Sequence, residues 1–189
     1  MAIALGMCFI GGSARAGADN AITLEPLALV YARTIALEYE RGFGTVGLAL
    51  ATAVTLGDWS ASGSSGDYLA LGATLGVRFY PWTEAPAGPF IGPFGGIAWV
   101  DASGGGEASS GIGWSVGALA GWSWTLGGGR EQPSGPSGGP PPDQSSGGFV
   151  LSLGAGAAWY AYDLELSSGA SVGRQGFLPA LRLAVGAAF

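Results

Sequence analysis

Four charged residues are the strongest candidates for chemistry in this sequence. Glu38 and Glu40 are two positions apart, and Arg78 and Arg182 each stand among alternating large apolar and small residues. In an extended strand, this spacing places all four side chains on the face that carries the small residues. An enclosed charge is costly unless it is paired, and arginine forms bidentate contacts with carboxylates. We expect the four to form a charge network that plugs an enclosed interior. The alternative is a gate that opens a small conduit when the pairs exchange partners.

The common catalytic side chains are scarce in this chain. It has no histidine, and its single cysteine, Cys8, lies in a segment that we expect to be removed. The usual routes to general-base, thiol and metal chemistry are therefore missing. We predict no catalytic residue, no cofactor and no metal site, and a protein that is not an enzyme. A lipid-modifying enzyme is the alternative.

The composition limits where such a chain can reside. Charged residues make up 11% of it and apolar residues 48%, whereas about 25% of the residues are charged in ordinary soluble domains. Most of the surface is therefore expected to face something other than water. Glycine, serine, threonine or a charge interrupts every long apolar stretch, which argues against a membrane-spanning helix of about 20 residues. The net charge of −6 makes nucleic acid a poor partner.

After residue 20, large apolar residues alternate with small ones for about ten residues at a time, and turn-rich breaks separate the runs. This period of two indicates β-strands. The fifth run is irregular because Gly92, Pro93, Gly95 and Gly96 interrupt it, and we interpret the interruption as a bulge without assigning its faces. Eight strands are predicted in all: 21–31, 34–41, 45–56, 67–80, 90–100, 112–124, 149–162 and 177–189.

The large apolar side chains are expected to point outward. The interior of an eight-stranded barrel is only wide enough for packed side chains, so it could not hold all of them. The opposite arrangement, a soluble lipid-carrying barrel, would leave an exterior of small residues with very little charge. A lipid-facing arginine at the membrane midplane would cost about 2–4 kcal/mol, which also favours an inward Arg78 and Arg182. We therefore predict an all-β fold, an eight-stranded antiparallel up-and-down transmembrane barrel with both termini on the periplasmic side.

Aromatic residues are expected to form two girdles, one at each interface between membrane and water. The strand directions predict that one girdle lies at the end of the barrel that holds the termini and the other at the opposite, outer end. The first set is Tyr39, Phe43, Phe79, Trp82, Phe90, Trp122, Trp124, Phe149 and Phe189. The second set is Tyr31, Trp59, Trp99, Trp114, Trp159 and Phe177.

Two segments fall outside the strand pattern. Residues 1–16 form a short apolar run ending in Ser13-Ala14-Arg15-Ala16, which predicts a cleavable signal peptide, although no basic residue precedes the run and the true start can lie elsewhere. Residues 17–189 would then be the barrel domain. The stretch 127–148 is rich in glycine and proline without apolar periodicity, and it predicts a flexible insertion between the sixth and seventh strands.

The closing run of the chain alternates apolar residues and ends in an aromatic: Leu181, Leu183, Val185 and Phe189 share one side. This run resembles the C-terminal assembly signal of bacterial outer-membrane proteins, although Ala187 is smaller than usual. Leu37-Glu38-Tyr39-Glu40-Arg41, Val77-Arg78-Phe79-Tyr80-Pro81 and Phe90-Ile91-Gly92-Pro93 resemble strands of uncharacterised small barrels related in shape to the OmpA membrane domain. The resemblance implies insertion by the outer-membrane assembly machinery and supplies no reaction.

These observations together predict a protein of the bacterial outer membrane with a structural or interaction role in the cell envelope. The expected partners are membrane lipids, including lipopolysaccharide, and the assembly machinery, and a monomer is favoured. Acidic residues that we expect in outer loops could meet lipopolysaccharide through bridging divalent cations, but they lack the spacing of a metal site. A lipid-modifying enzyme, a narrow gated channel and a soluble lipid carrier are the alternatives.

Overall fold

A computed structural model describes residues 18–61, 64–104, 107–127, 147–165 and 171–189 of the 189-residue chain. Its elements in these ranges are eight β-strands and one short helix, α1 (Pro26–Ala32). The strands are β1 (Asn20–Leu24), β2 (Thr34–Phe43), β3 (Val46–Ala61), β4 (Ser64–Phe79), β5 (Gly88–Gly104), β6 (Glu107–Leu126), β7 (Gly148–Glu165) and β8 (Ser171–Ala188).

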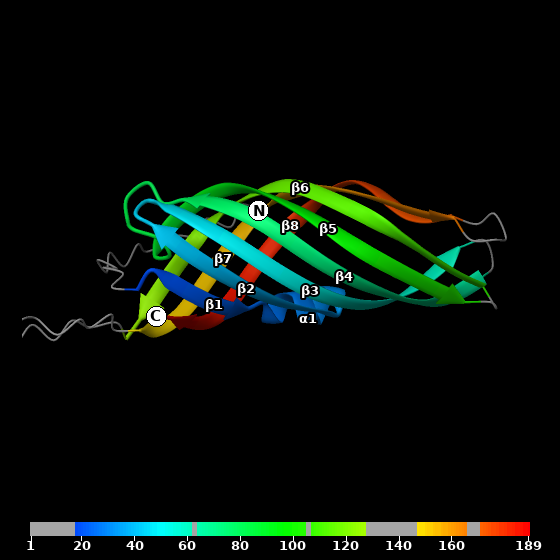
Figure 1. The fold of residues 1–189 in the computed structure, drawn as a ribbon, viewed down its shortest axis with the longest axis horizontal. Helices are drawn as coiled ribbons and strands as arrows, with labels where there is room; N and C mark the ends of the chain where they lie inside the picture. Colours follow the sequence, from blue (N-terminus) through cyan, green and yellow to red (C-terminus); the bar gives the residue numbers. More distant parts are fainter. Residues whose placement is uncertain (1–17, 62–63, 105–106, 128–146, 166–170) are drawn as a thin grey trace, which may run out of the picture.

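The eight strands form an antiparallel sheet that closes on itself in a ring. Each strand pairs with the next along the chain, and β1 pairs with both β2 and β8. Two backbone hydrogen bonds join the ends of the described chain, from the Asn20 nitrogen to the Phe189 oxygen at 3.1 Å and from the Phe189 nitrogen to the Asn20 oxygen at 2.9 Å. The strands run obliquely along an elongated molecule (Figure 1). The predicted number, direction and meander order of the strands are therefore confirmed.

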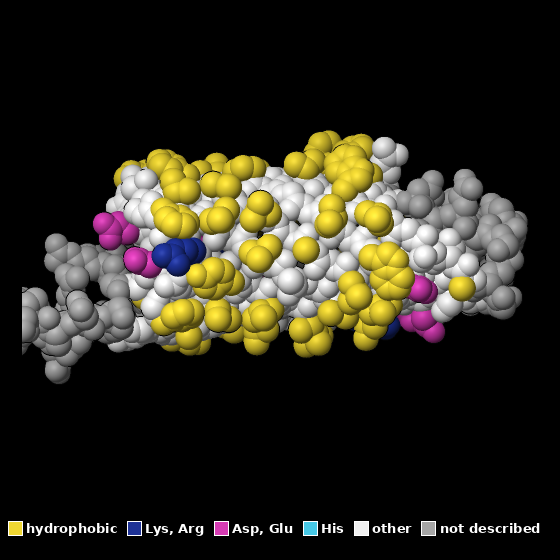
Figure 2. Space-filling model, viewed as in Figure 1, with side chains coloured by type: hydrophobic (Ala, Val, Ile, Leu, Met, Phe, Trp, Pro, Cys, Tyr) yellow, Lys and Arg dark blue, Asp and Glu magenta, His cyan; other side chains and the backbone are white. Residues whose placement is uncertain are grey.

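The two faces of the sheet carry different residues, as the alternation predicts. On β3, for example, Leu48, Leu50 and Val54 are exposed on the outside, while Ala49 between them is buried. The buried charged residues, Glu38, Glu40, Arg78 and Arg182, are all on the inner face. On the face shown in Figure 2, hydrophobic side chains cover the middle of the molecule, and charged side chains lie near its two ends. The outside of the ring is thus apolar, and its inside holds small and charged residues.

The first predicted strand, 21–31, is wrong beyond Leu24. The chain forms only five strand residues there and then turns into α1. Pro26 begins the helix, where its fixed φ angle and missing N–H are tolerated. Arg33 ends it in the left-handed conformation (φ 49°), with its backbone N–H bonded to the Ala28 oxygen. A proline inside an apparent strand was the available signal for this break.

The predicted bulge in the fifth strand is also wrong. The register of β5 against β4 is the same on both sides of Pro93, because Leu75 pairs with Gly95 and Phe79 pairs with Ile91. Alternation therefore continues without a slip, with Phe90 facing inward and Ile91 facing outward. The ladder is only interrupted at Pro93, which has no N–H to donate.

Most strands extend beyond their predicted outer ends. β3 continues to Ala61 and β5 to Gly104, so Asp58 and Asp101, which we expected in loops, are strand residues. β1 and β2 are much shorter, and the wall is therefore lower on their side. There α1 contacts β2, β3 and β8, and it lies beside β2 and β3 along the wall in Figure 1.

Two predicted segments cannot be compared with the structure. The signal peptide, 1–16, lies outside the described residues, and so do residues 128–146 of the insertion. The ends of the insertion, Gly127 and Gly148, lie at the same end of the ring as Asn20 and Phe189.

Candidate functional site: an interior charge network beneath a cavity

The four charged residues predicted to pair come together inside the ring from three strands. Glu38 and Glu40 are inward residues of β2, Arg78 is near the end of β4, and Arg182 is in β8. β1, the strand between β2 and β8, is short and carries the small inward side chains of Ala21 and Thr23, so Arg182 can reach across it. Arg78 reaches β2 from the other side, across β3. All four residues are buried.

Arg78 bridges the two carboxylates of β2. Its Nη2 lies 2.5 Å from Oε2 of Glu38, and its Nη1 donates a hydrogen bond to Oε2 of Glu40. The second oxygen of Glu40 accepts a 2.6 Å hydrogen bond from the Tyr80 hydroxyl. The Arg78 guanidinium also stacks over the ring of Phe90, 5.2 Å from its centroid. One arginine is therefore fixed from two sides by charge and from a third by an aromatic face.

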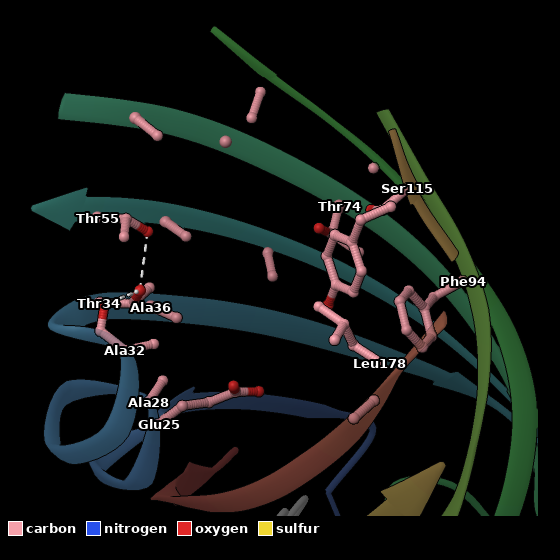
Figure 3. Close-up of a pocket in the computed structure, with 18 of the residues that line it drawn as sticks. Glu25, Ala28, Ala32, Thr34, Ala36, Thr55, Thr74, Phe94, Ser115 and Leu178 are labelled. Carbon is pink, nitrogen blue, oxygen red and sulfur yellow. Dashed lines mark hydrogen bonds between the residues drawn. The ribbon is translucent and has the colours of Figure 1, made fainter. Parts of the chain in front are cut away.

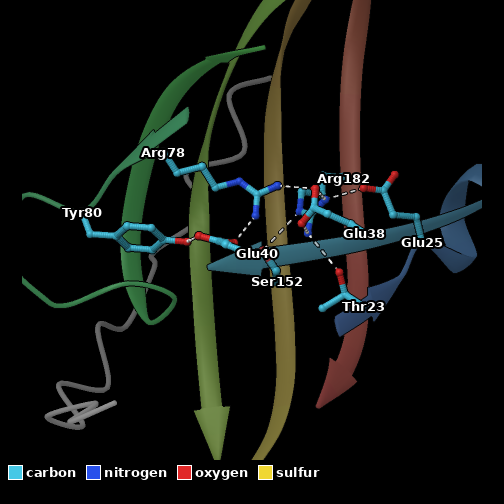
Figure 4. Close-up of polar contacts among 8 residues, drawn as sticks. All are labelled: Thr23, Glu25, Glu38, Glu40, Arg78, Tyr80, Ser152 and Arg182. Carbon is cyan, nitrogen blue, oxygen red and sulfur yellow. Dashed lines mark hydrogen bonds and ion pairs between the residues drawn. The ribbon is translucent and has the colours of Figure 1, made fainter. Parts of the chain in front are cut away.

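Arg182 forms the second half of the network. Its Nη1 and Nη2 lie 3.0 and 2.8 Å from the two oxygens of Glu38, which is the bidentate geometry that arginine favours. Its Nη1 also bonds to Oε1 of Glu25, and weaker 3.4 Å contacts reach Ser152 and Thr23. Figure 4 shows the resulting line from Tyr80 to Glu25 across the ring. Charges alternate along that line, which offsets much of the cost of burying them.

Sequence reasoning missed Glu25, Thr23, Tyr80 and Ser152 as members of this network. Glu25 shares the strand parity of Ala21 and Thr23, so its inward direction could have been read from the alternation. Tyr80 was expected on the small-residue face, but the parity of a strand does not identify the partner of a hydroxyl. Which strands bring these side chains within bonding distance depends on the register across the closed ring.

The interior differs on the two sides of the network. Toward the termini it is filled, because Tyr80, Ala85 and Phe90 form a buried cluster with Leu119 against it. Toward the other end a cavity of about 890 Å³ begins at Glu38, Arg78 and Arg182. Alanine is the most frequent residue in its walls, together with glycine and with hydroxyl, aromatic and larger aliphatic side chains. The network therefore forms the floor of the cavity.

Large inward aromatic side chains fit against glycines of neighbouring strands. A Cβ atom on Gly121 would lie 2.7 Å from Cζ of Phe90, and one on Gly117 would lie 2.7 Å from Cζ of Phe94. Both distances are shorter than real Cβ contacts allow. The many glycines of this chain therefore make room for the few large side chains that the narrow interior holds.

The predicted girdle residues separate into two groups. The exposed outward members include Phe43, Phe79 and Trp82 at the end that holds the termini, and Trp99, Trp114 and Phe177 toward the other. Partly exposed members are Tyr39, Trp122, Trp124 and Trp159. Phe149 and Phe189 are also exposed, and the side chain of Tyr31 lies outside the described part of the chain.

Two girdle predictions are corrected. Trp59 is only 7% exposed and faces inward, where it packs near Val100 and Ala102 and donates to the Ser103 oxygen at 3.3 Å. It was expected on the rim because its strand was predicted to end at Leu56, whereas the alternation of β3 continues and turns Trp59 inside. Phe90 is buried beneath Arg78, because the alternation of β5 continues without a bulge and places Phe90 on the inner face.

The residues of the predicted assembly signal share the outward face of β8. Leu181 and Phe189 are exposed, and Leu183 and Val185 between them are partly exposed. Within the described ranges, no group of three or more His, Cys, Asp or Glu residues is arranged to hold a metal ion. No helix in the described part of the chain is long and apolar enough to cross a membrane.

Comparison with known proteins gives no relative for this chain. No family model matches it, and neither a curated protein nor a solved structure does. The function must therefore be argued from the ring itself, from its charge network and from its outer surface.

Proposed function

We propose that this chain is an eight-stranded transmembrane β-barrel of the bacterial outer membrane with a structural or interaction role in the cell envelope. The observation that carries the proposal is the division between the two faces of the sheet. Side chains such as Leu50, Leu75 and Ile97 are half exposed or more on the outside, while the buried charges lie inside. A bilayer suits this exterior, because each strand pairs with both of its neighbours around the ring and α1 stands where β1 does not reach along β8.

The height of the apolar exterior supports the same proposal. On β3, outward apolar residues run from Val46 to Leu56, interrupted by Thr52, and Asp58 follows as the first outward charge. On β5 they run from Ile91 to Trp99. A tilted membrane strand needs about 9–11 residues to cross the hydrocarbon layer. The strand residues beyond this band, including Asp67 and Ser103, would then project from the membrane.

The charge network supports a barrel without a permanent channel. Glu38 and Glu40 hold Arg78 and Arg182 across the interior, and Tyr80 and Phe90 fill the space beneath them. Opening a conduit would require exchange or loss of several charge-assisted hydrogen bonds, each of which is stronger than a neutral one. A role in presenting outer strands and loops, or in envelope integrity, therefore fits this interior better than steady conduction.

We further propose that the end holding Asn20 and Phe189 faces the periplasm. In this orientation the long strand extensions that carry Asp58, Asp67 and Asp101 project from the outer surface of the membrane, next to lipopolysaccharide. The apolar C-terminal face with Leu181 and Phe189 would serve as the signal that the assembly machinery reads.

Membrane fractionation combined with gel mobility before and after boiling tests this proposal. We expect the protein in the outer-membrane fraction, with a compact, SDS-resistant band that shifts only on boiling. A monodisperse protein that is stable in plain buffer would contradict the proposal and would favour a soluble carrier. Planar-bilayer recording separates the roles further, because steady single-channel steps would contradict a plugged interior.

A further inference from the structure

The wall of the ring is lower at β1 than elsewhere, because β1 is short and leaves part of one edge of β8 unpaired. β1 pairs with β8 only from Val185 to Ala188. Among the described residues, no strand pairs with this edge of β8 between Ser171 and Ala184. Helix α1 stands there instead, in contact with β2 and β8. The ring is therefore closed by strands at one level and by a short helix above it.

The cavity contacts β8 along an uninterrupted run of residues. On β4, every second residue from Tyr68 to Arg78 lines the cavity, as expected for the inner face of a strand. On β8, the five consecutive residues from Leu178 to Arg182 line it. Consecutive residues point to opposite faces of a strand. Shorter runs of three consecutive lining residues also occur on β5 and β6. The run of five on β8 is longer and lies where β1 does not pair with β8, so the cavity extends along this unpaired edge.

The outer surface around this edge is apolar. Leu29 and Val30 of α1 are exposed, Val30 to 82%, and Leu181 and Phe177 are exposed on β8. Ala28 and Ala32, on the other side of the helix, line the cavity (Figure 3). In the membrane orientation proposed above, on which this inference rests, hydrocarbon surrounds the opening, and the helix face that lines the cavity carries the small side chains of Ala28 and Ala32.

The chemistry of the cavity indicates what could occupy it. Its volume of about 890 Å³ lies within the range of about 300–1,000 Å³ that is typical of small-molecule sites with apolar walls and a few polar groups. Glu25 extends into it from the end of β1 (Figure 3). One oxygen of Glu25 bonds to Arg182, and no described residue donates to the other. This oxygen can accept a hydrogen bond from a ligand, and it lies between the charge network and the opening beside α1.

The charges of the network indicate which kind of polar head group a ligand in the cavity would carry. The network contains three carboxylates, Glu25, Glu38 and Glu40, and two guanidiniums, both already paired. An anionic head group would add a fourth negative charge beside Glu25. A neutral hydroxyl could instead donate to Glu25 without breaking an existing pair.

We propose that the cavity binds one hydrocarbon chain of a single-chain amphiphile with a neutral, hydrogen-bond-donating head. The chain enters from the membrane past α1 and the free edge of β8. The head lies near Glu25, and the chain lies against the alanine and glycine walls between Ala53 and Ala98.

Native mass spectrometry of the refolded protein, released from detergent in the presence of 1-monopalmitoylglycerol, tests the proposal. We expect a one-to-one adduct. Ala53→Trp and Ala70→Trp each place a large side chain in the cavity, and Ala118→Trp makes the same change on the outer face of β6. Because displacing even two methylene groups from an apolar site weakens binding about tenfold, the adduct should fall at least that much in the filled variants and persist in Ala118→Trp.

The outcomes separate this proposal from the membrane assignment. An unchanged adduct in a filled variant that still shows heat-modifiable mobility would overturn the cavity site and leave the barrel intact. Palmitate, tested on the unaltered protein, should bind at least about tenfold more weakly, and equal binding would overturn the choice of head group. Stability of the protein in buffer without detergent would contradict the membrane location, whatever the adduct shows.

Discussion

Glu38 holds the charge network together at the level of single residues. Among the described residues, it is the one carboxylate that contacts both Arg78 and Arg182, while Glu25 and Glu40 each contact one of them. Removing a shared partner from a buried pair leaves charge without compensation, and this costs more than the pair itself contributes. The energetic role of the network therefore depends chiefly on this glutamate.

We predict that Glu38→Gln lowers the free energy of unfolding by about 3–5 kcal/mol, measured by urea titration of the protein refolded in phospholipid vesicles. Asp58→Asn is the matched control, since Asp58 forms an exposed 2.6 Å ion pair with Arg33 and such pairs contribute less than about 1 kcal/mol. Equal losses of unfolding free energy in the two variants would show that the interior ion pairs contribute no more to stability than the exposed pair.

From the sequence we could predict which face of a strand a side chain is on, but not which side chains lie within bonding distance of one another. Strand parity alone placed Glu38, Glu40, Arg78 and Arg182 on one face. The same parity indicates that Glu25 points inward, but we did not include Glu25 in the predicted network, and the strand predicted to hold it ends at Leu24. Nothing in the order of residues specifies that Arg182 meets Glu38 across the short β1, because that contact requires the ring to close with β1 between β2 and β8.

At the scale of elements, Gly92 lies against the backbone of β4 where Pro93 interrupts the ladder between β4 and β5. A Cβ atom on Gly92 would lie 1.7 Å from the Val77 oxygen, whereas one on Gly95 would have no neighbour nearer than 3.7 Å. Gly92 is therefore required by a backbone contact, and Gly95 on the same strand is not.

We predict that Gly92→Ala destabilises the protein by about 1–3 kcal/mol, as overpacking does elsewhere, while Gly95→Ala changes the free energy of unfolding by less than about 1 kcal/mol. The same urea titration measures both. A larger loss in Gly95→Ala than in Gly92→Ala would contradict the register described for β4 and β5.

The C-terminal strand allows a matched test of the assembly signal. Phe189 directly follows β8, Phe177 lies within the strand toward its other end, and both side chains are exposed. Phe189→Ala keeps the backbone bonds to Asn20 and removes only the aromatic ring. We predict that it reduces the amount of heat-modifiable protein in the outer membrane of expressing cells, and that Phe177→Ala does not. Equal amounts of folded protein in both variants would contradict a signal that depends on the final aromatic residue.

The strands themselves were predicted wherever alternation is uninterrupted, but the outer ends of most of them were placed too early. The consequence of a single proline was predicted less well. Pro26 turns the expected continuation of β1 into a helix, while Pro93 leaves β5 in register. Both prolines were visible in the sequence, but their consequences differ. Pro26 can start a helix at the end of a strand, whereas Pro93 stays within a strand held on both sides by neighbours.

At the scale of the whole molecule, alternating strands and the count of turns were sufficient to predict a ring of eight. The low wall beside α1 could not be predicted, since it follows from the short β1, which pairs with β8 only from Val185 to Ala188. The same feature connects the cavity to the exterior. The account as a whole depends on hydrocarbon being the medium that the outward apolar residues contact.

A nitroxide scan along β3 tests this claim most directly. Each position from Val46 to Leu56 is changed in turn to cysteine, spin-labelled in the protein reconstituted in vesicles, and measured for collision with oxygen, which partitions into lipid, and with a water-soluble nickel chelate. We predict an oscillation of period two in which oxygen accessibility peaks at the even positions, such as Leu48, Leu50 and Val54, and is low at Ala49, Ala51 and Ala53. An oscillation of the opposite phase, or nickel accessibility as high at Leu50 as in water, would contradict the account.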